Sequence, residues 1–121
     1  MKTLLLIAHG SRRRESNEEV ARLAEVLRER AVGRFDYVTH AFLELGEPSI
    51  GTAVDDAVSR GASEIVVLPY FLAAGTHVVN DIPGIVAEKQ AEHPGVQIRA
   101  ARYLGTADGL PDILLALAEV A

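Results

Sequence analysis

Two histidines occupy corresponding places in this sequence, each shortly after an apolar segment. His9 directly follows residues 3–8 and precedes Gly10, a residue that lets the chain turn sharply. His77 follows residues 65–71 through a short loop. Imidazoles so placed could hold a metal ion together, or one could act as a general base near neutral pH. The alternatives are that His9 caps backbone groups of its turn and that His77 is an ordinary polar loop residue.

Both apolar segments predict buried strands. Short uncharged apolar runs that end in a turn signal are typical of parallel strands covered on both faces. Open α/β sheets bind their ligands beyond the carboxyl ends of such strands. We therefore expect His9 and His77 to flank one crevice at this edge of the sheet.

Glu44 ends a further strand-like segment, residues 35–44, and is expected near the same edge. Its carboxylate could complete a His/His/carboxylate site for a divalent metal or help to accept a proton. The alternative is a solvated carboxylate before the turn that follows. We expect structural roles for the two remaining histidines. His40 falls inside this segment, and His93 lies at the end of an expected helix.

Three consecutive arginines form the densest positive charge in the chain: Arg12, Arg13 and Arg14. They lie just upstream of an expected helix, and both arginine side chains and helix N-terminal amides bind carboxylates or phosphates. This suggests an anionic substrate, although a solvated loop is the default explanation of any short charge run.

An apolar stretch leads up to the second histidine. It could line a pocket for a flat apolar ligand, or its larger members could simply pack in the core at the strand end. Its residues are Tyr70, Phe71, Leu72, Ala73 and Ala74.

Composition limits the function classes. With 121 residues, 49% of them hydrophobic, the chain is expected to form one domain over residues 1–121. It contains no cysteine, so any metal site must use histidine, carboxylate or water ligands. A net charge of −5 argues against nucleic-acid binding. No stretch is long enough to span a membrane or to act as a signal peptide, so we expect no membrane partner and a cytoplasmic protein.

The expected elements alternate between strands and helices, which predicts a parallel sheet. Ser16 and Glu19 have the spacing of a capping box for the first helix. The fold predicted is a doubly wound, flavodoxin-like α/β domain with strand order 2-1-3-4 and helices on both faces. Strands are expected at residues 3–8, 35–44, 64–71 and 96–100, and helices from Ser16, from Pro48-Ser49, from Asp81 to Glu92 and from Pro111, the last with an apolar side that includes Ala121.

Several segments together resemble the small CbiX proteins, which are sirohydrochlorin cobaltochelatases related to the SirB ferrochelatases. The resemblance covers the first two-thirds of the chain in the right order and spacing. The segments are Ala8-His9-Gly10-Ser11-Arg12, Ala41-Phe42-Leu43-Glu44 with Pro48, Leu68-Pro69-Tyr70-Phe71-Leu72, Gly75-Thr76-His77 and Asp81-Ile82-Pro83.

The resemblance implies ATP-independent insertion of Co2+, or alternatively Fe2+ or Ni2+, into sirohydrochlorin, as in cobalamin or sirohaem-type tetrapyrrole biosynthesis. His9 and His77 correspond to the paired metal-site and catalytic histidines, and Glu44 to an assisting carboxylate. The metal is a substrate and no permanently bound cofactor is implied. A homodimer that brings two domains face to face is the implied assembly. The residues expected to bind the tetrapyrrole are Ser11, Arg12, Arg13, Arg14, Tyr70, Phe71, Leu72, Ala73, Ala74, Gly75 and Thr76.

Two other function classes remain open. A metal or tetrapyrrole carrier would use the same histidines without turnover. A histidine phosphatase would use His9 as phosphoryl acceptor, but Ala8 replaces the arginine that such enzymes carry there, and the chain is short for that fold. The sequence leaves the physiological metal, the exact tetrapyrrole and the role of Glu44 as ligand or proton acceptor undecided.

Overall fold

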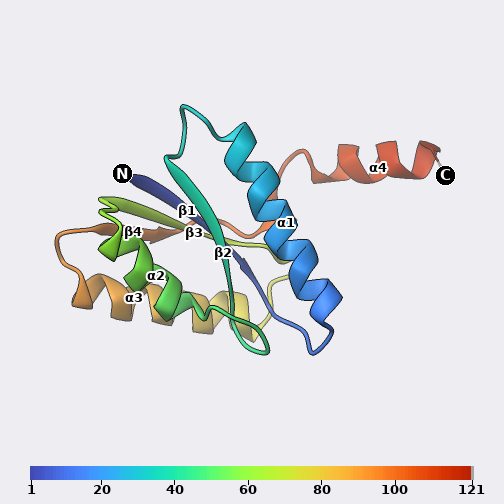
Figure 1. The fold of residues 1–121 in the computed structure, drawn as a ribbon. Helices are drawn as coiled ribbons and strands as arrows, with labels where there is room; N and C mark the ends of the chain where they lie inside the picture. Colours follow the sequence, from blue (N-terminus) through green and yellow to red (C-terminus); the bar gives the residue numbers. More distant parts are fainter. Residues whose placement is uncertain (121) are drawn as a thin grey trace.

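The computed structural model describes residues 1–120, so Ala121, expected on the apolar side of the last helix, lies outside the described residues. Strands and helices alternate along the chain (Figure 1). The elements are β1 (Lys2–Ala8), α1 (Arg14–Arg30), β2 (Tyr37–Phe42), α2 (Ile50–Ser59), β3 (Glu64–Pro69), the π-helical turn η1 (His77–Asp81), α3 (Ile82–Glu92), β4 (Gln97–Ala100), the 3-10 turn η2 (Leu104–Thr106) and α4 (Leu110–Val120).

The four strands form one parallel sheet in the order β2-β1-β3-β4, which confirms the predicted fold class and topology. Strand β1 is central and pairs with β2 through Ala8 opposite Phe42, and with β3 through Ile7 opposite Pro69. The carboxyl ends of these three strands therefore meet at one edge. His9 follows β1 at this edge, as the sequence predicts.

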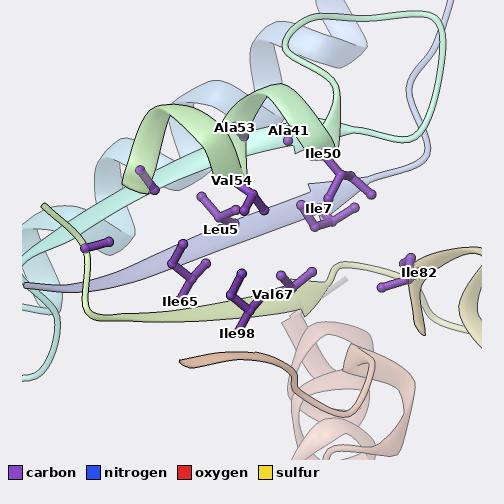
Figure 2. Packing of buried hydrophobic residues seen from close by; sticks show 12 residues of the cluster. Leu5, Ile7, Ala41, Ile50, Ala53, Val54, Ile65, Val67, Ile82 and Ile98 are labelled. Carbon is purple, nitrogen blue, oxygen red and sulfur yellow. The ribbon is translucent and has the colours of Figure 1, made fainter. Parts of the chain in front are cut away.

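Alternate residues of each strand pack on opposite faces of the sheet, as the strand period of two requires. On one face, Leu5 and Ile7 pack with residues from α2 and α3, including Val54 and Ile82 (Figure 2). On the other face, Leu4, Leu6 and Ala8 pack against α1. Strand β1 is thus covered on both sides, which explains its unbroken apolar sequence.

The first and second helices differ in how well the sequence located their starts. The predicted capping box of α1 is wrong, because α1 begins at Arg14 and Ser16 lies inside its first turn. The prediction for α2 is confirmed: the Ser49 hydroxyl accepts a hydrogen bond from Thr52 N at 3.2 Å and caps the helix. Strands β2 and β3 are shorter than predicted, so Glu44 lies two residues beyond β2.

The segment around His77 also differs from the prediction. The sequence placed His77 in a loop and a helix start at Asp81, but a π-helical turn already begins at His77 and continues into α3. The Asp81 side chain does not cap α3 and contacts His77 instead. Ile82, 1% exposed, anchors this junction in the core beyond the ends of β1 and β3 (Figure 2).

No helix in the described residues is both long enough and apolar enough to cross a membrane. The predicted C-terminal helix is present as α4, but its apolar residues are exposed rather than packed on the sheet. Figure 1 shows α4 projecting away from the other elements.

His40 generates a prediction about stability and pH. It lies on β2, an edge strand, with its ring 5.4 Å from the Phe42 ring between centroids. Burial lowers the pKa of His40 below 6.5, and the charge of Glu25 offsets part of this shift. The unfolded chain therefore binds this proton more readily than the folded chain, and the free energy of unfolding falls as the pH is lowered through about 6.5.

We expect His40→Gln, which cannot titrate, to reduce this fall. Urea denaturation of both proteins at about pH 7.5 and about pH 5.5 measures the difference. An identical pH dependence in the variant would contradict the prediction.

Candidate active site

The turn after β1 is packed directly onto the backbone of Glu44. Glu44 N donates a hydrogen bond to His9 O at 3.0 Å, and Gly10 adopts a φ of 98°, in the left-handed region. A Cβ atom at Gly10 would collide with the carbonyl oxygen of Glu44. Glycine is therefore required both by the backbone conformation and by this close approach. The turn fixes His9 and Glu44 relative to each other.

Asn17 ties the same two loops together from the first turns of α1. Its Nδ2 donates to Ser11 O and to Leu45 O, each at 2.9 Å, and its Oδ1 accepts from Ser11 N at 3.0 Å. Sequence reasoning missed this positioning residue. The signal available was an asparagine in an early helical turn, where its amide can satisfy free backbone groups of nearby loops.

His9, His77 and Glu44 lie together, as the sequence predicts. The rings of His9 and His77 have centroids 4.7 Å apart and cross at 82°. Nε2 of His9 lies 3.4 Å from Oε1 of Glu44. The three side chains are 46%, 40% and 53% exposed, in the order His9, His77, Glu44, so a bound substrate can reach them.

His77 is oriented by a carboxylate of its own. Its Nδ1 lies 2.6 Å from Oδ2 of Asp81, and Ile82 N donates to His77 O, which closes the π-helical turn. When Nδ1–H donates to this carboxylate, a neutral imidazole keeps its lone pair on Nε2. In that tautomer, Nε2 is the ring nitrogen that is left free to bind a metal ion. The sequence analysis named Asp81 as the start of a helix and as part of a family segment, but it did not assign Asp81 to the site. The i,i+4 spacing from His77 would have been informative only with a helical segment predicted to begin at His77.

An open cavity of about 500 Å³ adjoins the two histidines. Apart from His77, its titratable lining residues are the carboxylates Glu44, Asp81 and Glu88, which favour a cation over an anion at this point. Glu44 and His77 line this cavity, and His9 lies directly beside both of them. The lining residues are Leu43, Glu44, His77, Asn80, Asp81, Gly84, Ile85 and Glu88.

The three arginines expected to bind an anion differ in their pairing. Arg13 lies 3.9 Å from Glu15, and Arg14 lies 3.2 Å from Glu18, both on exposed surface. Arg12 is the one of the three that makes no ion pair within residues 1–120. The Ser11 hydroxyl accepts a hydrogen bond from Arg13 N at 3.0 Å and so stabilises the turn.

The apolar stretch before His77 is divided between two surfaces. Phe71 lies on the histidine side, with its ring 6.4 Å from that of His9 between centroids. Tyr70 faces the other way and lines a separate groove next to α1. The following residues are exposed: Leu72, Ala73, Ala74, Gly75 and Thr76. A ligand at the histidines therefore lies on the side of Phe71 and this loop, whereas the Tyr70 ring lines the groove.

A second histidine–carboxylate cluster lies away from the cavity, between α2 and α3. Asp55, Glu92 and His93 are the residues of the described chain that each place one ligand atom within 4.8 Å of the others. The Lys89 ammonium occupies this cluster, at 3.0 Å from Asp55 and 2.8 Å from Glu92. Hydrogen bonds from His93 and then Lys89 lower the pKa of Asp55. The cluster is thus an ion-pair network joining two helices, and His93 has a structural role.

The model of the CbiX family matches residues 3–120. The chain belongs to the CbiX family. It is 38% identical over 118 residues to the sirohydrochlorin cobaltochelatase of Sulfolobus acidocaldarius, covering 98% of this chain and 90% of that protein. It is 40% identical over 93 residues to the sirohydrochlorin cobaltochelatase of Methanocaldococcus jannaschii, covering 77% of this chain and 64% of that protein. The chloroplastic sirohydrochlorin ferrochelatase of Arabidopsis thaliana is 35% identical over 111 residues, covering 92% of this chain and 48% of that protein.

Solved structures agree with this assignment. A CbiX protein from Marinobacter aquaeolei is 36% identical with a TM-score of 0.74, covering 99% of this chain and 93% of that chain. SirB from Bacillus subtilis, solved in complex with cobalt, is 27% identical with a TM-score of 0.85. That alignment covers 98% of this chain and 50% of the SirB chain, so this CbiX chain corresponds to half of SirB.

The close approach at Gly10 predicts a large effect of Gly10→Ala. The matched control is Gly33→Ala, because Gly33 has a similar φ of 87° but a Cβ there points into open space among the described residues. Both variants carry the cost of left-handed backbone, about 1–2 kcal/mol. Only Gly10→Ala must also displace Glu44, which adds about 1–3 kcal/mol. Urea denaturation measures both, and equal losses of unfolding free energy would contradict the packing described here.

Proposed function

We propose that this CbiX protein inserts a divalent metal ion, Co2+ first among the candidates, into sirohydrochlorin without ATP. The observation that carries the proposal is the meeting of His9, His77 and Glu44 beside an open acidic cavity. Family membership and the relatives described above support the reaction class. Fe2+ and Ni2+ are the alternative metals, and both are tested in the same assay.

The two imidazoles are proposed to hold the incoming metal. Nε2 of His77 is the free nitrogen of a ring oriented by Asp81, and the His9 ring meets it edge to face. Histidine and carboxylate ligands suit Co2+, Fe2+ and Ni2+ alike. Within residues 1–120, the ligand atoms of His9, His77 and Glu44 do not all lie within 4.8 Å of one another. An open site of this kind suits a metal that must leave for the macrocycle.

Metal insertion also requires the macrocycle to lose its pyrrole protons. Glu44 lies beside His9 and is half-exposed, so it can accept a proton directly or receive one from the imidazole. Each proton removed from a pyrrole nitrogen passes to one of these groups and then to solvent, while the freed nitrogen lone pair binds the metal. His9 and Glu44 are the proposed proton acceptors in this scheme.

The tetrapyrrole is proposed to lie over the exposed loop that follows β3. Phe71 beside His9 and the exposed Leu72 offer apolar surface to a flat ring. Arg12, which makes no ion pair within residues 1–120, offers a positive charge to the carboxylates at the ring periphery. Arg13 and Arg14 would first have to leave their glutamate partners. The remaining proposed contacts are Ser11, Tyr70, Ala73, Ala74, Gly75 and Thr76, of which Tyr70 fits least well because it faces the groove beside α1.

The assembly proposed for this reaction is a homodimer of one-domain chains in the cytoplasm. Correspondence to half of SirB supports a second copy, because one copy leaves the histidine cavity open on its outer side. The metal enters the scheme as substrate and leaves in the product, so the proposal requires no bound cofactor.

Replacement of the paired histidines tests the proposal. We expect His9→Ala and His77→Ala each to reduce the rate of Co2+ insertion at least about 100-fold, because each removes a ligand or proton acceptor. His93→Ala is the matched control, since it removes an imidazole bound to Asp55 outside the cavity. Absorbance under anaerobic conditions follows the insertion of Co2+, Fe2+ and Ni2+, and thermal unfolding checks each variant.

Three results would contradict parts of this proposal. Equal activity in all three folded variants would remove the assigned site. A wild-type rate no faster than spontaneous insertion, with tight metal binding, would make the protein a carrier. Release of phosphate from a generic phosphomonoester would favour the phosphatase reading.

Asp81 provides a more specific test. We expect Asp81→Asn to lower Co2+ insertion about 10–100-fold, because the carboxylate that orients His77 is lost while the side-chain shape is kept. Asp55→Asn is the matched control, since it alters the corresponding contact with His93, at 2.9 Å, away from the cavity. If the two variants lose activity equally, Asp81 has no special role in positioning His77.

A further inference from the structure

The last helix of the chain is apolar and uncovered. Helix α4 contacts chiefly the short turn η2 of its own chain, and Figure 1 shows it extending away from the sheet. Every residue from Pro111 to Val120 is exposed. The large apolar side chains among them are between 56% and 82% exposed: Ile113, Leu114, Leu115, Leu117 and Val120.

Such a helix requires a partner to be stable. An isolated helix shorter than about 12–15 residues is marginal in water, and α4 has 11 residues. Its apolar residues also surround the axis, because Ile113 and Leu117 lie on one side while Leu114 and Leu115 extend the apolar surface around it. A helix of this kind is normally buried on more than one side.

The face of the sheet that carries α1 is only partly covered by helices. Helix α1 lies over β2 and β1, whereas α2 and α3 together cover the opposite face. One helix, about 10 Å wide, covers roughly two strands spaced about 4.8 Å apart, which leaves the β3 side of this face without a helix. An apolar groove of about 360 Å³ lies there, lined by Leu6, Leu23, Leu27, Leu68, Pro69, Tyr70, Arg102, Tyr103, Leu104, Thr106 and Ala107.

We propose that α4 of one copy packs into this groove of a second copy, and that the exchange is reciprocal. The chain is directed away from its own groove, because Leu110 N donates to Ala107 O and Ile113 N donates to Gly109 O as the helix begins. Leu104, Thr106 and Ala107 line the rim of that groove only a few residues earlier. For α4 to pack into the groove of its own chain, the segment that joins Ala107 to Leu110 would have to turn back in the opposite direction.

A second copy also covers α4 better than its own chain could. A single groove buries one side of the helix, whereas a two-fold exchange can place the two α4 helices against each other as well. The charges agree with this partner: α4 carries Asp112 and Glu119 and no basic residue, and the charged residue in the groove lining is Arg102. Exchange of an element between identical chains is a low-cost route to a dimer.

The surface involved is large enough for a stable dimer. A large apolar side chain contributes roughly 60–120 Å² when it is buried. Four such side chains from each helix, with the groove surface that they cover in both copies, amount to roughly 1,400 Å², within the range of about 1,200–2,000 Å² for specific interfaces. The inference rests on the homodimer proposed above and names a contact that would hold it together. The exchanged helix itself does not cover His9, Glu44 or His77, because none of them lines the groove.

The oligomeric state of charge variants gives the first test. We expect the full-length protein to have the mass of a dimer in light scattering, and Leu114→Glu/Leu117→Glu to raise the dimer Kd at least about 30-fold. The control is Ala87→Glu on α3, which adds a charge to the opposite face of the sheet and leaves the dimer intact. A monomeric wild-type protein would overturn the inference together with the dimer. A double variant that dimerises as tightly as the control would overturn the exchange alone.

Cross-linking identifies what the groove holds. Because the chain has no cysteine, Leu27→Cys/Leu117→Cys places one thiol in the groove and one on α4 without background. After treatment with a short bismaleimide, exchange predicts covalent dimers in which peptide mapping joins residue 27 of one copy to residue 117 of the other. Intramolecular links in a monomer, or no more linkage than in Ala87→Cys/Leu117→Cys, would reject it. Metal insertion is not measured in either experiment, so this inference and the proposed chelatase activity fail independently.

Discussion

The structure depends on the position of β1 at the centre of the sheet. Its parallel pairing with β2 and β3 brings the ends of three strands to one edge, and its burial on both faces allows no other placement of this apolar segment. His9 follows β1, Glu44 follows β2 and the loop to His77 follows β3. Residues separated by more than thirty positions in the chain therefore meet because of strand order.

Backbone contacts then set the finer geometry of the site. The glycine at position 10 lets the β1 turn lie against the backbone of Glu44, and Asn17 ties the same two loops through three hydrogen bonds. His77 is fixed separately, by a π-helical turn anchored through the buried Ile82. Each of the two site histidines lies beside a carboxylate, His9 beside Glu44 and His77 beside Asp81. The two rings can thus differ in role although they are in contact.

Helices cover the two faces of the sheet unequally, which leaves an apolar groove beside α1, away from the histidine site. Helices α2 and α3 cover one face, whereas α1 covers only part of the other and α4 extends away from it. The apolar groove beside α1 includes Tyr70, which the sequence grouped with Phe71. Successive residues at the end of β3 therefore serve opposite sides of the sheet, one in the groove and one beside His9.

The sequence by itself determined the strand order, the burial of β1 and the meeting of His9, His77 and Glu44. These follow from apolar runs, turn residues and the rules for parallel crossovers, which act over short stretches or whole elements. Tertiary structure alone decided the π-helical turn at His77, the contact with Asp81, the role of Asn17 and the exposure of α4. The π-helical turn and the role of Asn17 depend on contacts beyond their neighbouring residues, those of Ile82 with the core and of Asn17 with two loops. The exposure of α4 depends on the direction in which the chain continues after η2. Local propensity carries no information about such contacts, which explains why the capping box at Ser16 was predicted where packing started the helix at Arg14.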